Sequence, residues 1–237
     1  MTGPGGTDGA AGPVVVARGL RVGYGDVAVC GPVDLALAPG EVLAVVGPNG
    51  SGKSTVLKTV LGRLDALGGI VEVLERPVDE RERAFRARVA GVGDDDAYFP
   101  GLSVREHLVL LARGHGVDQA GTVVDEVMAM FGITSRADAA PTELSSGQRR
   151  RLLLATAFVR PRDVLVLDEP EQRLDPGTRR LVADLIAAEA ARGVAVLLAT
   201  HDPEVAARTG ARGLLVGEDA CTDVARDDLA GVLAAVR

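Results

Sequence analysis

The chain has 237 residues, of which 47% are hydrophobic and 25% charged, a composition that favours a packed globular fold and excludes extensive disorder. Its formal net charge of −7 disfavours the broad basic surface that nucleic-acid binding requires, so we expect no nucleic-acid partner. No apolar run approaches the roughly 18 residues needed to cross a bilayer, so the chain is predicted not to span a membrane.

The N-terminal region divides into a leader and a hairpin. Residues 1–13 are mostly Gly, Pro, Thr and Ala, which predicts a disordered leader before a single domain over residues 14–237. The stretch from Val14 to Val29 alternates and is interrupted by glycines, which predicts a hairpin of short strands with Tyr24 at its tip. From these residues alone, Tyr24 either stacks on a nucleotide base or packs on the hairpin edge.

A phosphate-binding loop follows a short buried strand. The strand is predicted at 41–46, and Leu57, Val60, Leu61 and Leu64 recur at helical spacing behind the loop. Between them the spacing Gly-x-x-x-x-Gly-Lys-Ser matches the P-loop pattern in full, and its glycines allow backbone N–H groups to surround phosphates. We expect Lys53 to bind the β- and γ-phosphates and the Ser54 hydroxyl to bind Mg²⁺. The predicted nucleotide-binding residues of the loop are Gly47, Pro48, Asn49, Gly50, Ser51, Gly52, Lys53, Ser54 and Thr55.

The middle of the chain is predicted to be largely helical. Strands are expected at 69–74 and 88–92, and the charged run at 79–88 is typical of a solvated helix face. Ser103 and Glu106 form a capping box that starts a helix, and a second helix is expected at 122–131. These helices form a helical insertion at roughly 95–145. His107 and His115, in or near this insertion, are interpreted as surface residues.

Two buried strands are predicted to end in polar side chains. The apolar run at 164–167 leads into Asp168 and Glu169, and the run at 194–199 leads into His201. Because open α/β sheets bind ligands at the carboxyl ends of their strands, we expect Asp168 to hold Mg²⁺ and Glu169 to activate water as a general base. The structural alternative is a carboxylate pair that caps a turn before Pro170. We expect His201 to contact the γ-phosphate.

The remaining elements complete an alternating pattern. A second capping box, Ser145 with Gln148, starts a helix that ends before Pro161, and Asp175 caps another helix. That helix has an expected buried stripe of Leu181, Val182, Leu185 and Ile186. The last strand is predicted at 213–216 and a closing helix at 227–236. Strands alternate with helices, so a mostly parallel sheet with helices on both faces is expected.

The two cysteines, Cys30 and Cys221, form no Cys-x-x-Cys pattern. We therefore expect two isolated thiols that pack as small hydrophobic side chains.

The ordered motifs resemble those of the ABC ATPase family. They are Gly-Pro-Asn-Gly-Ser-Gly-Lys-Ser-Thr at 47–55, Leu-Ser-Ser-Gly-Gln at 144–148, Val-Leu-Val-Leu-Asp-Glu-Pro at 164–170, Leu-Asp at 174–175 and Ala-Thr-His-Asp at 199–202. The resemblance covers residues 14–216, and the Leu-Ser-x-Gly-Gln element makes it more specific than the P-loop alone. It implies an α/β P-loop NTPase with a mostly parallel central sheet, an N-terminal antiparallel β subdomain and a helical insertion subdomain. It also implies ATP and Mg²⁺ as ligands.

The resemblance further implies a head-to-tail dimer with itself or a related nucleotide-binding subunit. In such a dimer Ser145 and Gly147 contact the γ-phosphate bound to the opposite copy, and Ser146 and Gln148 belong to the same element. Tyr24 resembles the aromatic residue that stacks on adenine, and Asp175 resembles a loop residue that contacts the dimer partner.

The chain departs from the family pattern at several positions. Asp94 stands where the family has a Gln that contacts Mg²⁺; it is either a metal ligand or part of a solvated acidic loop. Ser146 replaces a Gly, and Glu171, Gln172 and Arg173 replace smaller residues.

The resemblance implies an ATP-hydrolysing subunit that powers a separate transmembrane permease. Such a subunit would be cytoplasmic, on the inner face of the membrane. Its docking patch would be the apolar residues of the insertion (Val104 and 108–111), unless these pack only into the core of the insertion itself. One alternative is a soluble ABC ATPase with a non-transport function, for example in iron–sulfur assembly. Another is a nucleotide-gated binding module without turnover, against which the intact Lys53, Asp168, Glu169 and His201 argue, whereas Asp94 leaves it open.

Overall fold

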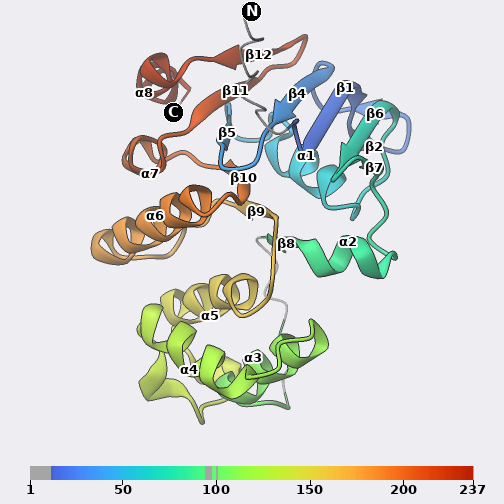
Figure 1. Ribbon diagram of the computed structural model, residues 1–237. Coiled ribbons are helices and arrows are strands. Elements are labelled where there is room, and N and C mark those ends of the chain that lie inside the picture. The colour runs from blue at the N-terminus through green and yellow to red at the C-terminus, as the bar shows by residue number, and fades with distance from the viewer. Residues whose placement is uncertain (1–11, 94–97, 100, 237) are drawn as a thin grey trace, which may run out of the picture.

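The computed structural model describes residues 12–93, 98–99 and 101–236. Most of the predicted leader and Asp94 lie outside these residues. The described part contains a central six-stranded sheet and a smaller antiparallel sheet beside it. Three helices, formed by residues 104–114, 120–130 and 146–158, lie below both sheets in Figure 1.

The central sheet has the strand order β12-β11-β5-β10-β9-β8, and all of its pairs are parallel except β11 with β12. Consecutive residues of its strands face two different cores: Val164 and Val166 enter one, and Leu165 and Leu167 enter the other. Burial on both faces explains why these strands are continuous apolar runs. The strands are Val42–Val46 (β5), Val89–Val92 (β8), Val164–Asp168 (β9), Ala195–Ala199 (β10), Arg212–Val216 (β11) and Cys221–Val224 (β12).

The N-terminal strands form an antiparallel sheet of order β4-β1-β6-β7, which confirms the predicted β subdomain. The adjoining hairpin pairs β2 with β3 and places Tyr24 opposite Val27. The bounds are Val15–Arg21 (β1), Gly23–Tyr24 (β2), Val27–Ala28 (β3), Val33–Leu37 (β4), Gly68–Val73 (β6) and Arg76–Pro77 (β7).

The helices lie in distinct places. Helix α1 lies between the two sheets, whereas α3, α4 and α5 lie together in the lower part of Figure 1, between β8 and β9 in the chain. Both predicted capping boxes form: Ser103 with Glu106 at α3 and Ser145 with Gln148 at α5. The helices are Lys53–Val60 (α1), Arg83–Arg88 (α2), Val104–Gly114 (α3), Ala120–Met130 (α4), Ser146–Phe158 (α5), Pro176–Ala191 (α6), Pro203–Thr209 (α7) and Leu229–Ala235 (α8). Within the described ranges, no helix combines the length and apolar character needed to cross a bilayer.

Four expectations from the sequence are wrong. The strand at 213–216 was predicted to be the last, but β11 is followed by β12 at the edge of the sheet. The residues of β12, Cys-Thr-Asp-Val, are too polar to indicate a strand in the sequence. His107 is buried at 2% exposure because α3 turns it inward. Leu181 is 38% exposed rather than part of the buried stripe of α6. Cys30 and Cys221 pack in one hydrophobic core as expected, but they are not isolated from each other, because Cys221 Sγ donates to the carbonyl oxygen of Gly31, the residue after Cys30, at 3.5 Å.

Candidate nucleotide-binding and active site

The strand register brings three predicted motifs to one edge of the central sheet. Strand β10 lies between β5 and β9, and its Ala199 pairs with Val45 on one side and Asp168 on the other. The P-loop therefore leaves β5 beside the point where Asp168 ends β9 and where the chain continues from β10 to His201. Open α/β sheets bind ligands at this edge.

Two glycines of the P-loop have no space for a side chain. Gly47 has a φ of +152°, and a Cβ placed on it would lie 2.7 Å from the carbonyl oxygen of Val216. Gly52 has a φ of +101° at the start of α1, and its Cβ would lie 2.9 Å from Val29 Cγ2. Between them 48–50 are exposed, and the hydroxyl oxygen of Ser51 is buried without a hydrogen-bond partner among the described residues. This exposed, glycine-dependent turn at a helix N-terminus can bind phosphate oxygens.

The Lys53 side chain is buried within the P-loop. Its Nζ donates hydrogen bonds to the carbonyl oxygens of Gly47 at 2.9 Å and Pro48 at 2.8 Å. Burial lowers the pKa of Lys53, and the negative charges of Glu169 and Asp168 act in the opposite direction. The ammonium group therefore lies within the electrostatic influence of both carboxylates. Ser54 and Thr55 follow in the first turn of α1.

Asp168 fits the Mg²⁺ role predicted for it. Its side chain is 6% exposed, and Oδ1 is buried without a hydrogen-bond partner among the described residues. Those residues contain no cluster of three or more His, Cys, Asp or Glu side chains that could hold a metal ion. The orphaned Oδ1 of Asp168 is a carboxylate oxygen of the kind that Mg²⁺ uses, since Mg²⁺ commonly binds one or two carboxylates together with water and substrate phosphates.

Glu169 adopts a strained backbone conformation that points its carboxylate at His201. Its φ is +46°, which is uncommon for a residue other than glycine and typical of functional sites. The backbone is held on both sides, because its N–H donates to Ala199 O at 2.9 Å and its carbonyl accepts from Gln172 N at 3.0 Å. Glu169 Oε1 lies 3.3 Å from His201 Nε2. The two predicted catalytic side chains are thus in direct contact.

Three further residues support this pair and were not predicted from the sequence. Gln172 donates from its side chain to Glu169 Oε2. Buried Glu171 accepts hydrogen bonds from the Thr200 hydroxyl and from the backbone N–H of His201. Burial raises the pKa of Glu171, against the effect of these hydrogen bonds. For Glu171 and Gln172 the only local signal was that they replace smaller residues of the family pattern, whereas Thr200 lies within the Ala-Thr-His-Asp motif.

Arg150 links the helical part to the catalytic strand. From α5 it donates to the carbonyl oxygens of Gly93 at 2.8 Å and Glu169 at 2.8 Å, and to that of Asp168 at 2.5 Å. A buried guanidinium that satisfies three backbone carbonyls ties the start of α5 to the end of β9. Nothing in the local pattern of three consecutive arginines distinguishes Arg150 from its neighbours.

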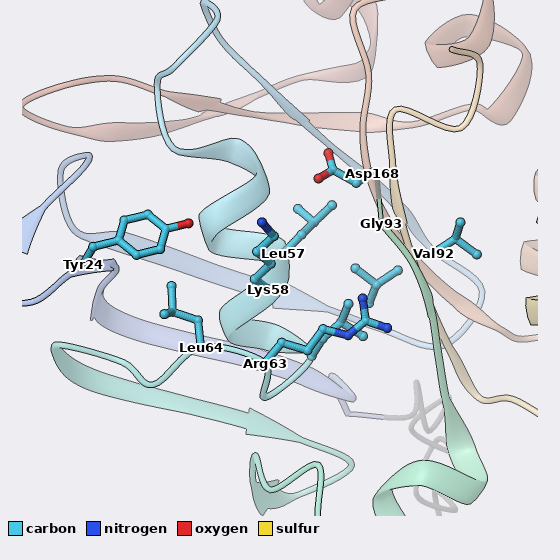
Figure 2. Close-up of a pocket in the computed structure, with 10 residues that line it drawn as sticks. Tyr24, Leu57, Lys58, Arg63, Leu64, Val92, Gly93 and Asp168 are labelled. Atoms are coloured by element: carbon cyan, nitrogen blue, oxygen red, sulfur yellow. The ribbon is translucent and has the colours of Figure 1, made fainter. Parts of the chain in front are cut away.

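Tyr24 and Asp168 line one cavity of about 290 Å³ beside α1. Figure 2 shows Tyr24 on one side of this cavity and Asp168 on the other, with Leu57 and Lys58 between them. Tyr24 is 56% exposed, so its ring is accessible to a ligand. Gly93, which precedes Asp94, lines the same cavity.

The remaining predicted residues lie elsewhere. Ser145, Ser146, Gly147 and Gln148 form the N-terminal turn of α5, which Figure 1 places in the lower part of the molecule, apart from α1. A Cβ on Gly147 would lie 2.9 Å from the carbonyl oxygen of Arg173. Asp175 is exposed and caps α6 by accepting from Thr178 N at 3.0 Å. One copy of the chain therefore does not bring these residues together with its own P-loop.

The fold and this site define a P-loop NTPase. A family model described as ABC transporter matches residues 30–172. The chain belongs to the ABC transporter family.

Curated relatives share the family and a common name. "Nod factor export ATP-binding protein I" of Paraburkholderia xenovorans is 38% identical over 191 residues, covering 80% of this chain and 63% of the relative. The protein of that name from Bradyrhizobium diazoefficiens is 38% identical over 205 residues, covering 86% and 67%. That from Burkholderia pseudomallei is 40% identical over 187 residues, covering 78% and 62%. The chain thus spans about two thirds of the length of these relatives.

Solved structures agree with the fold. The "Structure of ATP binding subunit of ABC transporter" has a TM-score of 0.82 at 22% identity, covering 93% of this chain and 99% of that one. The structure of cbiO1 from Clostridium perfringens, described as part of the ABC transporter complex cbiONQ, has a TM-score of 0.77 at 24% identity, covering 92% and 91%. At these identities the likeness confirms the predicted α/β fold.

Proposed function

We propose that this chain binds ATP with Mg²⁺, hydrolyses it, and thereby powers a separate membrane permease. The observation that carries this proposal is the convergence of Lys53, Asp168, Glu169 and His201 at one edge of the sheet, beside the P-loop. The names of the relatives favour transport over iron–sulfur assembly, and export over import.

In this proposal each side chain has one task in hydrolysis. Lys53 exchanges its loop carbonyls for phosphate oxygens, and free backbone N–H groups of the P-loop surround the phosphates. Ser54 and Asp168 would hold Mg²⁺, which neutralises charge on the phosphates when bound. Glu169 accepts the proton of the attacking water, while His201 and Gln172 orient its two carboxylate oxygens and His201 reaches the γ-phosphate.

We further propose that the site is completed by a second copy, or by a related subunit, bound head to tail. Ser145, Ser146, Gly147 and Gln148 would then close over the nucleotide of the partner, because a helix N-terminus binds anions. Ser145 and Ser146 are exposed, so they are accessible to a partner's nucleotide. A Ser at position 146, where the family has a Gly, is compatible with this contact because Ser is tolerated at a helix start. Asp175 would lie at the same interface.

The permease would bind the helical insertion at residues 95–145 and so hold the chain at the inner face of the membrane. A cavity of about 380 Å³ lies between this part and β8, lined by Tyr98, Phe99, His107 and Leu111 among others. Phe99 is 51% exposed and Leu110 is 47% exposed, whereas Val104 and Leu108 are buried in the core. A docking surface here would be smaller than the sequence predicted, with Phe99 and Leu110 as its exposed apolar residues.

The direct test of the activity is release of inorganic phosphate by the purified chain. We expect hydrolysis of ATP with Mg²⁺, and its loss when a chelator removes the ion. Binding of ATP without any turnover in the presence of Mg²⁺ and the co-purifying membrane protein would contradict the proposal, leaving only a nucleotide-binding module.

Replacing Tyr24 with Ala is expected to raise the KM for ATP by on the order of tenfold with little change in kcat. Stacking on a base contributes about 1–3 kcal/mol and is the same in the ground and transition states. Steady-state kinetics measure both constants. Tyr24→Phe retains the ring and is the control. An unchanged KM in Tyr24→Ala would assign this side chain to the edge of the hairpin.

A further inference from the structure

The two cysteines of this chain meet in space. Cys30 lies between β3 and β4 and is 6% exposed, while Cys221 begins β12 and is half-buried. The sulfur of Cys221 donates a hydrogen bond to the carbonyl oxygen of Gly31, the residue after Cys30, at 3.5 Å, and each thiol shifts the pKa of the other as a neighbouring group does. Two neighbouring thiols can form a disulfide, whose bond length is about 2.05 Å.

The backbone around the two thiols is fixed by close packing. The N–H of Gly31 donates to the carbonyl oxygen of Gly217 at 3.0 Å, and a Cβ on Gly31 would lie 2.4 Å from Ala220 N. Cys221 itself pairs with Val216 across the β11–β12 ladder. These contacts hold the two segments side by side, so the sulfurs remain neighbours while the chain is folded.

Cys30 packs directly against the P-loop, and Cys221 is linked to the P-loop through Val216, its partner in the β11–β12 ladder. A Cβ on Gly52 would lie 3.4 Å from Cys30 Cβ and 3.5 Å from Cys30 Sγ, so the P-loop packs on this side chain. A Cβ on Gly47 would lie 2.7 Å from the carbonyl oxygen of Val216, the residue paired with Cys221. A covalent bond between the thiols would shift the Cys30 side chain, against which Gly52 packs.

We propose that Cys30 and Cys221 form a dithiol modification site, which small disulfides convert into an intramolecular disulfide that weakens nucleotide binding at the adjoining P-loop. The effect on binding rests on the function proposed above. Formation of the bond does not, because it depends only on the position of the two sulfurs.

The chemistry is thiol–disulfide exchange and is balanced. The more exposed Cys221 gives up its proton and attacks one sulfur of a small disulfide, forming a mixed disulfide and releasing one small thiolate, which takes up that proton. The Cys30 thiol then loses its proton and attacks the Cys221 sulfur, expelling the second small thiol. Two protein thiols are oxidised while one small disulfide is reduced to two thiols. The hydrogen bond from Cys30 lowers the pKa of Cys221 to about 7, which favours its role as the attacking group.

The test exposes the purified full chain to oxidised glutathione and follows three quantities. They are the number of free thiols, the disulfide-linked peptides identified by mass spectrometry, and the dissociation constant for ATP. We expect both thiols to disappear, Cys30 and Cys221 to be found in one linked peptide pair within a single chain, and the dissociation constant to rise several-fold. Dithiothreitol should reverse all three changes. Cys221→Ser should keep the affinity of the reduced wild type and should not lose affinity under oxidation.

Other results would overturn the proposal. Persistence of free thiols, a stable mixed disulfide with glutathione, or links only between chains would show that the two sulfurs do not form the bond. A fully formed internal disulfide with unchanged ATP affinity would refute the coupling to the P-loop. If the reduced wild type bound no ATP at all, the proposed function would fail, while the thiol count would still decide whether the disulfide forms.

Discussion

Replacing Glu169 with Gln is expected to lower the rate of ATP hydrolysis by about 10²–10⁴-fold while ATP still binds. The amide retains the size of the side chain, and its one oxygen can still accept a hydrogen bond in place of one of the two carboxylate oxygens that contact His201 and Gln172. It cannot accept the proton of the attacking water, so the loss falls on the chemical step. In the head-to-tail arrangement, ATP then remains between two copies, and a dimer should accumulate. Phosphate release and gel filtration with Mg²⁺ and ATP measure the two effects.

A matched control is available on α4. Glu126 is exposed and distant in sequence from every motif of the site, so Glu126→Gln removes one negative charge without touching the base. It should hydrolyse ATP as the wild type does. Hydrolysis at the wild-type rate in Glu169→Gln would show that another group activates water. A variant that is inactive and yet stays monomeric with bound ATP would contradict the proposed dimer.

Replacing Lys53 with Ala is expected to weaken ATP binding by about 10- to 100-fold, because charge-assisted hydrogen bonds contribute about 1.5–3 kcal/mol. The variant also leaves the carbonyl oxygens of Gly47 and Pro48 without the donor that now holds them. Burial lowers the pKa of Lys53, so holding the ammonium group charged inside the fold costs folding free energy. Its removal relieves that cost, and we therefore expect lost affinity without unfolding.

Titration with ATP and thermal unfolding separate these effects. Arg18→Ala is the charge-matched control, since Arg18 is an exposed cation on β1 whose only ion pair among the described residues spans 3.9 Å. Its affinity for ATP should equal that of the wild type. If Lys53→Ala bound ATP as tightly as the wild type, Lys53 would not contribute to ATP binding. A large fall in the unfolding temperature would instead assign it a structural role.

Local patterns were sufficient for much of the architecture. The apolar runs ending at Val46, Asp168 and Ala199 are strands of the central sheet, because strands buried on both faces need continuous hydrophobic residues. Ser103 and Ser145 cap helices as predicted, since a capping box is a contact within four residues. Strand β12 was missed because an edge strand needs few apolar residues. His107 was misplaced because its burial depends on how α3 packs against the rest of the fold.

The sequence by itself determined the order of strand, P-loop and helix, the residues that end the catalytic strands, and the family to which they belong. These features are local, and their spacing along the chain carries the information. Only the tertiary structure decided which distant residues meet: Glu169 with His201, Arg150 with the end of β9, and Cys30 with Cys221. Those contacts follow from the lateral order of the strands and the packing of α5 and β12, which no short stretch of sequence specifies.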